Sequence, residues 1–150
     1  MRAVVQRVAS AQVTVDDVVV GSIGRGLLLL LGIAADDGPA DIAWLSSKIA
    51  ALRIFPDNES RLNLAVGECA GDILVVSQFT LIASTKKGNR PSFNSAATPD
   101  VAQPLYESFV QEMQTRLGRP IRTGMFGAMM AVALVNDGPV TLVIDSRLRE

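Results

Sequence analysis

The sequence has 150 residues, of which 49% are hydrophobic and 19% charged, and its formal net charge is −1. This balance predicts a folded globular chain, which we expect to form one domain over residues 1–150. A net charge close to zero gives no global attraction for nucleic acid. A polyanionic partner would therefore have to be bound by a local group of residues. The chain has no histidine and one cysteine, which excludes Ser-His-Asp and Cys-His catalysis and histidine-ligated zinc.

The sequence shows no sign of membrane insertion or export. Its longest apolar run, residues 27–31, is too short to span a bilayer, and residues 1–7 lack the pattern of a signal peptide. The single cysteine, Cys69, precludes an intramolecular disulfide and fits a reducing compartment. We therefore expect a cytoplasmic protein with no membrane partner.

The first third of the chain predicts strands. Residues 2–9 and 12–20 alternate in hydrophobicity, and a hairpin turn is expected at Asp16-Asp17 inside the second run. Residues 27–34 form the continuous apolar run typical of a fully buried strand. The intervening glycines at positions 21, 24 and 26 are interpreted as turn glycines. The alternative is that they form a phosphate-binding loop. Their order does not match the dinucleotide fingerprint, and we expect no cofactor.

Two helices are expected. The first opens at residues 36–39, with acidic capping candidates and a proline in its first turn, and residues 54–56 end it. The second opens at residues 98–100, and Gly118 is a plausible stop. Helical spacing places two sets of apolar side chains toward the core: Ile42, Leu45, Ile49 and Leu52 on the first helix, and Val101, Leu105, Phe109 and Met113 on the second.

The remaining segments predict further strands and one long loop. Residues 62–66 are expected to form a short strand, residues 72–79 a buried strand, and residues 82–97 a surface loop. Strands outnumber helices without a regular βαβ order. The predicted fold is therefore α+β, with layered, barrel-like β-sheets covered by two main helices.

The hexapeptide Asn136–Thr141 (N-D-G-P-V-T) is unusual. Asp-Gly between the apolar runs 131–135 and 140–144 predicts a hairpin, yet Pro139 removes a backbone donor where the returning strand should pair. The tip would offer carbonyl oxygens, with no side chain at Gly138 and no N–H at Pro139. The tip either contacts a ligand through its rigid main chain or is only a rigid turn near a sheet edge.

A second polar segment, Ser77-Gln78-Phe79-Thr80-Leu81, leaves the buried strand at 72–79. Ser77 and Thr80 supply hydroxyls, Gln78 supplies an amide, and exposed backbone N–H groups are suited to stabilising an oxyanion. The alternative is a strand whose hydroxyls bond their own backbone.

Two further segments offer binding groups. Lys86, Lys87 and Arg90 form a basic patch in the long loop, interpreted either as a solvated face or as a phosphate contact. Residues 123–130 include Phe126 and Met129, which suit either a core or an adaptable pocket wall.

Together these segments resemble the D-aminoacyl-tRNA deacylase family. The resemblance is carried by residues 77–81 and 136–141, is supported by residues 6–8, 90–93 and 123–127, and extends over essentially the whole chain. It implies a cytoplasmic homodimer that hydrolyses the ester joining a D-amino acid to tRNA. It also implies a cis peptide between Gly138 and Pro139, and a site at the dimer interface where residues 77–81 of one subunit face the Gly-Pro tip of the other.

The resemblance gives each candidate residue an expected role. The catalytic group comprises Thr80, Ser77, Gln78 and Phe79, with Thr80 as either nucleophile or positioning group. Substrate contacts are expected from Gly138, Pro139, Asn136, Phe126 and Met129, tRNA contacts from Lys86, Lys87 and Arg90, and support for the motif from Arg7; no metal is expected. The alternatives are a non-catalytic dimeric module that binds an RNA end or nucleotide, and a structural dimer locked by the Gly-Pro tip.

Overall fold

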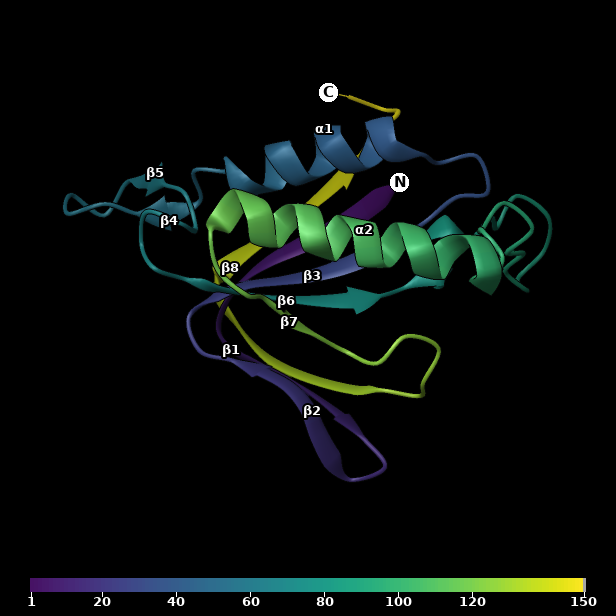
Figure 1. Cartoon of the computed structure of the whole chain (residues 1–150), viewed down its shortest axis with the longest axis horizontal. Coiled ribbons are helices and arrows are strands. Elements are labelled where there is room, and N and C mark those ends of the chain that lie inside the picture. The colour runs from purple at the N-terminus through teal and green to yellow at the C-terminus, as the bar shows by residue number, and fades with distance from the viewer. Residues whose placement is uncertain (150) are drawn as a thin grey trace.

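The computed structural model describes residues 1–149 and has one large curved sheet with two helices side by side on one of its faces (Figure 1). The strand order is β2-β1-β3-β6-β7, and β8 pairs with β1. The strands are β1 (Arg2–Val15), β2 (Val18–Ile23), β3 (Gly26–Gly32), β6 (Asp72–Ser77), β7 (Arg122–Thr123) and β8 (Ala131–Asp145). The sheet curls until β2 meets β7, where a Cβ on Gly21 would lie 2.4 Å from the Thr123 carbonyl oxygen. The predicted barrel-like α+β fold is confirmed.

The main core lies between the sheet and the helices α1 (Pro39–Ala50) and α2 (Pro99–Leu117). Helix α1 buries Ile42, Leu45 and Ile49 as predicted. The predicted inner face of α2 is correct in its second half, where Phe109 and Met113 are buried, and wrong in its first half, where Val101 is exposed and Leu105 only partly buried. The buried residues of α2 are Ala102, Tyr106, Phe109 and Met113, so the first two predicted positions are each one residue too early.

The N-terminal strands differ from the prediction in one respect. Residues 2–9 and 12–15 belong to a single strand, β1, that runs without a break. The expected turn is confirmed: Asp16 and Asp17 have φ values of 47° and 63°, and Val15 pairs with Val18 across them. Two consecutive positive φ values match the twist of the flanking strands.

Two of the expected turn glycines lie in strands instead. Gly24 is in the β2–β3 turn, but Gly21 belongs to β2 and Gly26 begins β3. A Cβ on Gly26 would lie 1.9 Å from the Asp72 carbonyl oxygen. This glycine permits close approach of β3 to β6.

The acidic residues before α1 do not cap it as predicted. Gly38 is the N-cap, and the carboxylate of Asp41 accepts its N–H at 2.9 Å. Asp37 is buried and accepts the N–H of Ala34 at 2.7 Å. Arg147 forms ion pairs with both Asp36 and Asp37, so the segment after β8 holds the start of α1.

The predicted hairpin at residues 136–141 is wrong. Residues 131–145 form one strand, β8, that runs along β1 in a single direction. Thr141 lies opposite Gln6 and Asn136 opposite Val8, so three extra residues bulge out of the ladder. Pro139, which has no N–H to donate, lies inside the bulge, and pairing with the same neighbour resumes beyond it.

The remaining elements are short. Strands β4 (Phe55–Pro56) and β5 (Leu62–Leu64) form a small second sheet. Strand β6 ends at Ser77, two residues before the predicted end, and the 3-10 turn η1 (Phe79–Ile82) follows. Among residues 1–149, no helix is long and apolar enough to cross a membrane.

Candidate active site

The turn that follows β6 brings together the four predicted catalytic residues. Ser77 ends the strand, and the N–H of Gln78 donates to the Leu31 carbonyl at 2.7 Å. The chain then turns into η1, closed by a bond from the Leu81 N–H to the Gln78 carbonyl at 3.2 Å. The polar run is thus a helical turn at the sheet's edge.

This turn offers donors and a hydroxyl. The first N–H groups of a helix have no intrahelical acceptor, which leaves those of Phe79 and Thr80 available to a ligand. Within residues 1–149, the one hydrogen bond to the Thr80 hydroxyl comes from the Gln78 amide. An amide cannot remove a proton, so Thr80 has no general base beside it.

The bulge in β8 is fixed by Arg7. This side chain is 8% exposed. Its Nη1 donates to the Ile54 carbonyl at 2.6 Å, and its Nε donates to the Asp137 carbonyl at 3.0 Å and lies 3.1 Å from an Asp137 carboxylate oxygen. The guanidinium therefore joins the bulge to a second segment of the chain.

Asn136 bridges the two ends of the bulge. Its Oδ1 accepts the Val140 N–H at 2.9 Å, and its Nδ2 donates to the Thr141 hydroxyl at 2.9 Å. Gly138 has a φ of 135°, and a Cβ there would lie 3.0 Å from Arg7 Nη2, so only glycine fits. The Gly138–Pro139 peptide is cis, as the resemblance implied.

The two motifs do not meet within one chain. Ser77 pairs with Leu31 at one end of the sheet, whereas Asn136 pairs with Val8 toward the other. Through the ladder, Val8 is level with Gly26 and Asp72. Ser77 is five residues further along β6, a separation of about 17 Å along the strands.

The basic loop lies beside the turn. The backbones of Ser84 and Ser92 exchange two hydrogen bonds, of 2.8 and 2.9 Å, and close off the segment that carries the exposed Lys86, Lys87 and Arg90. Just beyond, Phe93 packs edge-on against Phe79, with ring centroids 5.1 Å apart. Phe93 anchors the loop to η1.

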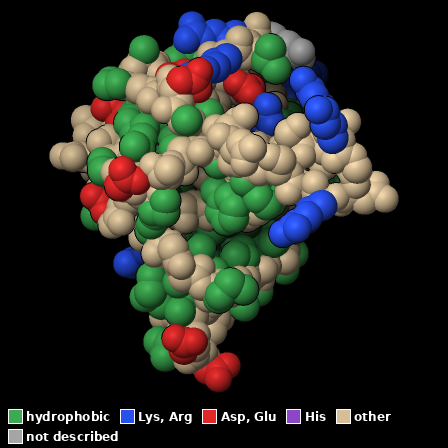
Figure 2. Space-filling view, turned by 90° about the vertical axis from the view of Figure 1, so that its right-hand side faces the viewer, with side chains coloured by type: hydrophobic (Ala, Val, Ile, Leu, Met, Phe, Trp, Pro, Cys, Tyr) green, Lys and Arg blue, Asp and Glu red, His purple; other side chains and the backbone are tan. Residues whose placement is uncertain are grey.

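The two predicted residues of the 123–130 segment lie in different surroundings. Phe126 is partly buried and its ring centroid lies 5.7 Å from that of Tyr106, beside a hollow of about 600 Å³. Met129 is 92% exposed. Figure 2 shows the side of the molecule that lies on the right in Figure 1. Apolar side chains gather in the middle of this face, and basic side chains lie toward its edge.

The family profile described as D-Tyr-tRNA(Tyr) deacylase matches residues 4–145. The chain belongs to this family. A deacylase of this kind is a hydrolase that acts on an ester bond, so the predicted enzyme class is confirmed.

Relatives within the deacylase family match the chain over its full length. It is 65% identical to a D-aminoacyl-tRNA deacylase of Opitutus terrae and 55% identical to one of Flavobacterium psychrophilum, each match covering 100% of both chains. Among solved structures, the c-Myc DNA Unwinding Element Binding Protein aligns with a TM-score of 0.91 and 40% identity, over 97% of this chain and 98% of that one. A eukaryotic structure assigned as a D-amino acid tRNA deacylase aligns at 0.81 and 21% identity, over 95% and 97%, and supports the fold alone.

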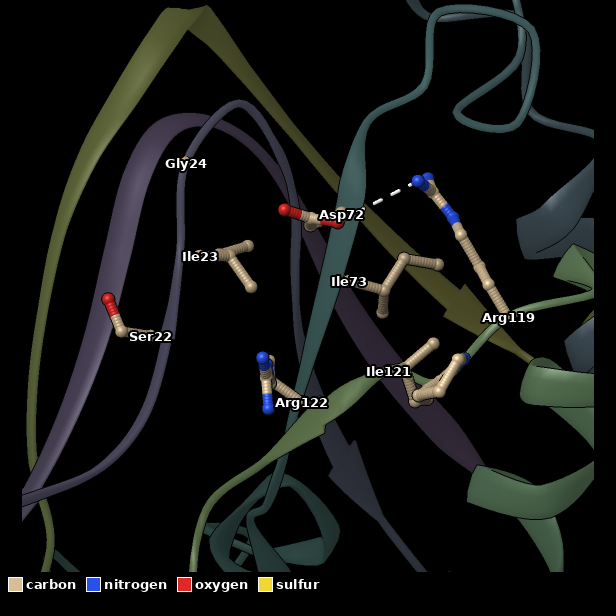
Figure 3. Close-up of a pocket in the computed structure, with 9 residues that line it drawn as sticks. Ser22, Ile23, Gly24, Asp72, Ile73, Arg119, Ile121 and Arg122 are labelled. Atoms are coloured by element: carbon tan, nitrogen blue, oxygen red, sulfur yellow. Dashed lines mark ion pairs between the residues drawn. The ribbon is translucent and has the colours of Figure 1, made fainter.

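A second hollow in this deacylase-family chain contains none of the residues expected to contact the substrate or tRNA, although Gly24 lines it. It measures about 540 Å³ and lies where β2 meets β7, at the Asp72 end of β6 (Figure 3). Arg119 pairs with Asp72 at 3.8 Å, and Arg122 extends between the strands. Among residues 1–149 no group of three or more His, Cys, Asp or Glu side chains is arranged to hold a metal.

One further contact to the turn after β6 was not predicted from the sequence. Arg2, at the start of β1, donates from Nη1 to the Leu81 carbonyl at 2.8 Å. No local pattern in the sequence signals this contact, because 79 residues separate the two partners.

Proposed function

We propose that the chain hydrolyses the ester between a D-amino acid and the 3′ end of tRNA, leaves L-aminoacyl-tRNA intact, and works as a homodimer. Each site would combine η1 of one subunit with the β8 bulge of the other. The observation that carries the proposal is that a deacylase-family chain has two backbone-built motifs, whose Ser77 and Asn136 lie about 17 Å apart along its own strands. A second copy can bring them together.

Exposed apolar side chains along β8 support the second copy. Val135 and Val143 are 57% and 68% exposed, and within residues 1–149 this long strand pairs with β1 alone. A long exposed strand with apolar side chains is a liability unless another chain covers it. A twofold dimer would cover this strand and complete two sites at once.

The bulge is suited to act as a chirality gate. The carbonyl oxygens of Gly138 and Pro139 would accept hydrogen bonds from the substrate's α-amino group, while their atoms occupy the direction of an L side chain. A D side chain would then point outward, so many D residues would be accepted. Each ~1.4 kcal/mol of steric clash gives tenfold discrimination against the L form.

The turn is suited to ester hydrolysis without a histidine. Water attacks the ester carbonyl, and the N–H groups of Phe79 and Thr80 stabilise the oxyanion that forms. The C–O bond to the ribose then breaks, which releases the free D-amino acid and tRNA. The neighbouring ribose hydroxyl would assist the attack, and Thr80 would position the ester.

The basic loop would hold the nucleic acid. Lys86, Lys87 and Arg90 project from a segment whose base, through Phe93, touches Phe79 of η1, so a phosphate bound there would lie close to the ester. We place the reaction in the cytoplasm, with no cofactor.

Survival of the ester on D-tyrosyl-, L-tyrosyl- and glycyl-tRNA tests the proposal. D-tyrosyl-tRNA should be cleaved and L-tyrosyl-tRNA spared. Glycyl-tRNA should also be cleaved because glycine has no side chain for the bulge to reject. Full resistance of glycyl-tRNA under conditions that clear D-tyrosyl-tRNA would contradict the steric gate.

The alternative is a nucleic-acid-binding module without catalysis. The solved protein at 40% identity is named for binding a DNA unwinding element, and the exposed cations of the loop suit such a role. The same assay separates the two: salt-dependent binding of both tRNAs without chiral cleavage would favour the module.

A further inference from the structure

We infer that Arg2 is a positioning residue for the reaction, because it holds the end of η1 and links that turn to the strand that carries the bulge. The inference rests on the placement of the reaction at η1, and it adds a residue that lies outside both motifs.

Leu81 and Ile82 of η1 pack beside Gly32 of β3, and Phe79 packs against Phe93, but η1 has few hydrogen bonds to the rest of the fold. None of its residues is buried, and no side chain caps its start. Its first anchor is the bond from the Gln78 N–H to the Leu31 carbonyl, and the bond from the Ala83 N–H to the Thr80 carbonyl lies within the turn itself. The bond from Arg2 to Leu81 is therefore the hydrogen bond that ties the end of η1 to the sheet.

Arg2 uses the geometry of its guanidinium to do this. Nη1 donates to the Leu81 carbonyl at 2.8 Å, Nε donates to the Asp145 carboxylate at 3.0 Å, and Nη2 lies 2.9 Å from the same carboxylate oxygen. The planar guanidinium thus donates hydrogen bonds to the carbonyl and to the carboxylate from fixed directions. A lysine has one ammonium on a flexible stem and cannot reproduce both contacts at once.

Asp145 connects this clamp to the second motif. It is the last residue of β8, the strand that carries Gly138 and Pro139, and it pairs with Arg2 in the β1–β8 ladder. Its other carboxylate oxygen accepts the Arg147 N–H at 2.9 Å. Arg2 and Asp145 together set the position of η1 relative to β8 within each subunit.

Kinetics of Arg2→Met, Arg2→Lys and Asp145→Asn on D-tyrosyl-tRNA test the inference. We expect kcat to fall about 10-fold in Arg2→Met with KM changed less than about 2-fold, because a displaced turn misplaces the oxyanion donors without weakening the tRNA grip. Arg2→Lys should recover only part of the loss. Arg2→Met with Asp145→Asn should be no slower than Arg2→Met alone. Arg61→Met is the control, since Arg61 forms an exposed ion pair with Glu59.

Amide hydrogen exchange at residues 79–83 gives a readout independent of activity. Exchange should be faster in Arg2→Met and unchanged in Arg61→Met, while the dimer fraction stays at the wild-type value and the melting temperature falls by only about 3 °C. Unchanged exchange, full activity of Arg2→Lys, or a loss of kcat that follows a loss of dimer would each overturn the role of Arg2. An inactive wild-type protein would instead refute the proposed function.

Discussion

The β8 bulge and the turn after β6 are both short polar breaks in strands, yet the protein fixes them in different ways. The bulge is held from within by Asn136 and from behind by the buried Arg7. The turn is held by hydrogen bonds near its two ends and by side-chain packing at Gly32 and Phe93, and Phe79 is still 58% exposed. The bulge is therefore rigidly held, whereas the turn is open to a ligand.

This difference matches the two tasks assigned to the motifs. Steric rejection of an L side chain needs a wall that does not yield, because each ångström of give would erase the clash that discriminates. Ester hydrolysis needs donors that a bulky tRNA end can reach. Substitutions in the bulge should therefore affect both stability and selectivity, whereas substitutions in the turn should affect turnover alone.

Arg7→Met should have the largest effect. It removes charged donors from two carbonyls, those of Ile54 and Asp137, and should lower the free energy of unfolding by about 3 kcal/mol. Urea denaturation measures this. Arg61→Met, at an exposed arginine, should stay within about 0.5 kcal/mol of the wild type. A similar small change in Arg7→Met would mean that the bulge is not held from behind.

Gly138→Ala should come next. The new Cβ would lie 2.8 Å from Val140 Cγ2 and 3.0 Å from Arg7 Nη2, at a φ of 135° that alanine does not tolerate. We expect kcat/KM on D-tyrosyl-tRNA to fall about 100-fold, since the carbonyls that hold the amino group are displaced. Gly118→Ala is the matched control: Gly118 also has a positive φ, but a Cβ there meets nothing within 4 Å. Wild-type kinetics in Gly138→Ala would remove the bulge from the site.

Thr80→Ala should have a smaller effect. Thr80 has no neighbouring base, so we expect it to position rather than attack. Its loss should then lower kcat about 10-fold and leave the urea midpoint unchanged. A fall to the uncatalysed rate would instead support Thr80 as the nucleophile.

The smallest effect should be a pH dependence of stability at Asp145. Burial would raise the pKa of this carboxyl, but hydrogen bonds from Arg147 and Arg2 outweigh it and hold the pKa below its ordinary value. Its contribution is therefore fully present above about pH 3.9 and is lost as pH falls through the lower folded-state value. Urea midpoints at falling pH should drop less in Asp145→Asn than in the wild type. Equal drops would mean that the clamp does not stabilise the charged form.

The predictions of secondary structure were correct where the local sequence pattern alone determines the structure. The buried strand, the Asp16-Asp17 turn and the face of α1 follow from periodicity and turn chemistry. The first half of the α2 face was wrong because Ala102 and Tyr106, instead of Val101 and Leu105, pack on the core, where the Tyr106 ring lies against Phe126 and its hydroxyl donates to Val75 of the sheet. The local sequence does not show which of these side chains will be buried by tertiary packing.

The functional motifs show the same limit. Residues 77–81 and 136–141 were identified from the sequence, but a bulge and a hairpin share the same Asp-Gly signal. Pairing of both halves of β8 with one long strand decides between them, and this pairing is a long-range property. The supports of the motifs, Ile54 behind Arg7 and Arg2 behind Leu81, are equally remote in sequence.

Complementation between two inactive variants tests the central claim most directly. Gly138→Ala damages the bulge, and Thr80→Arg blocks the turn with a side chain at an exposed position. If each site takes its turn from one subunit and its bulge from the other, mixed dimers keep one intact site. Equal mixing of the two variants should then restore about a quarter of wild-type D-tyrosyl-tRNA cleavage. Mixed dimers that form but stay inactive would show that the site is not shared between subunits.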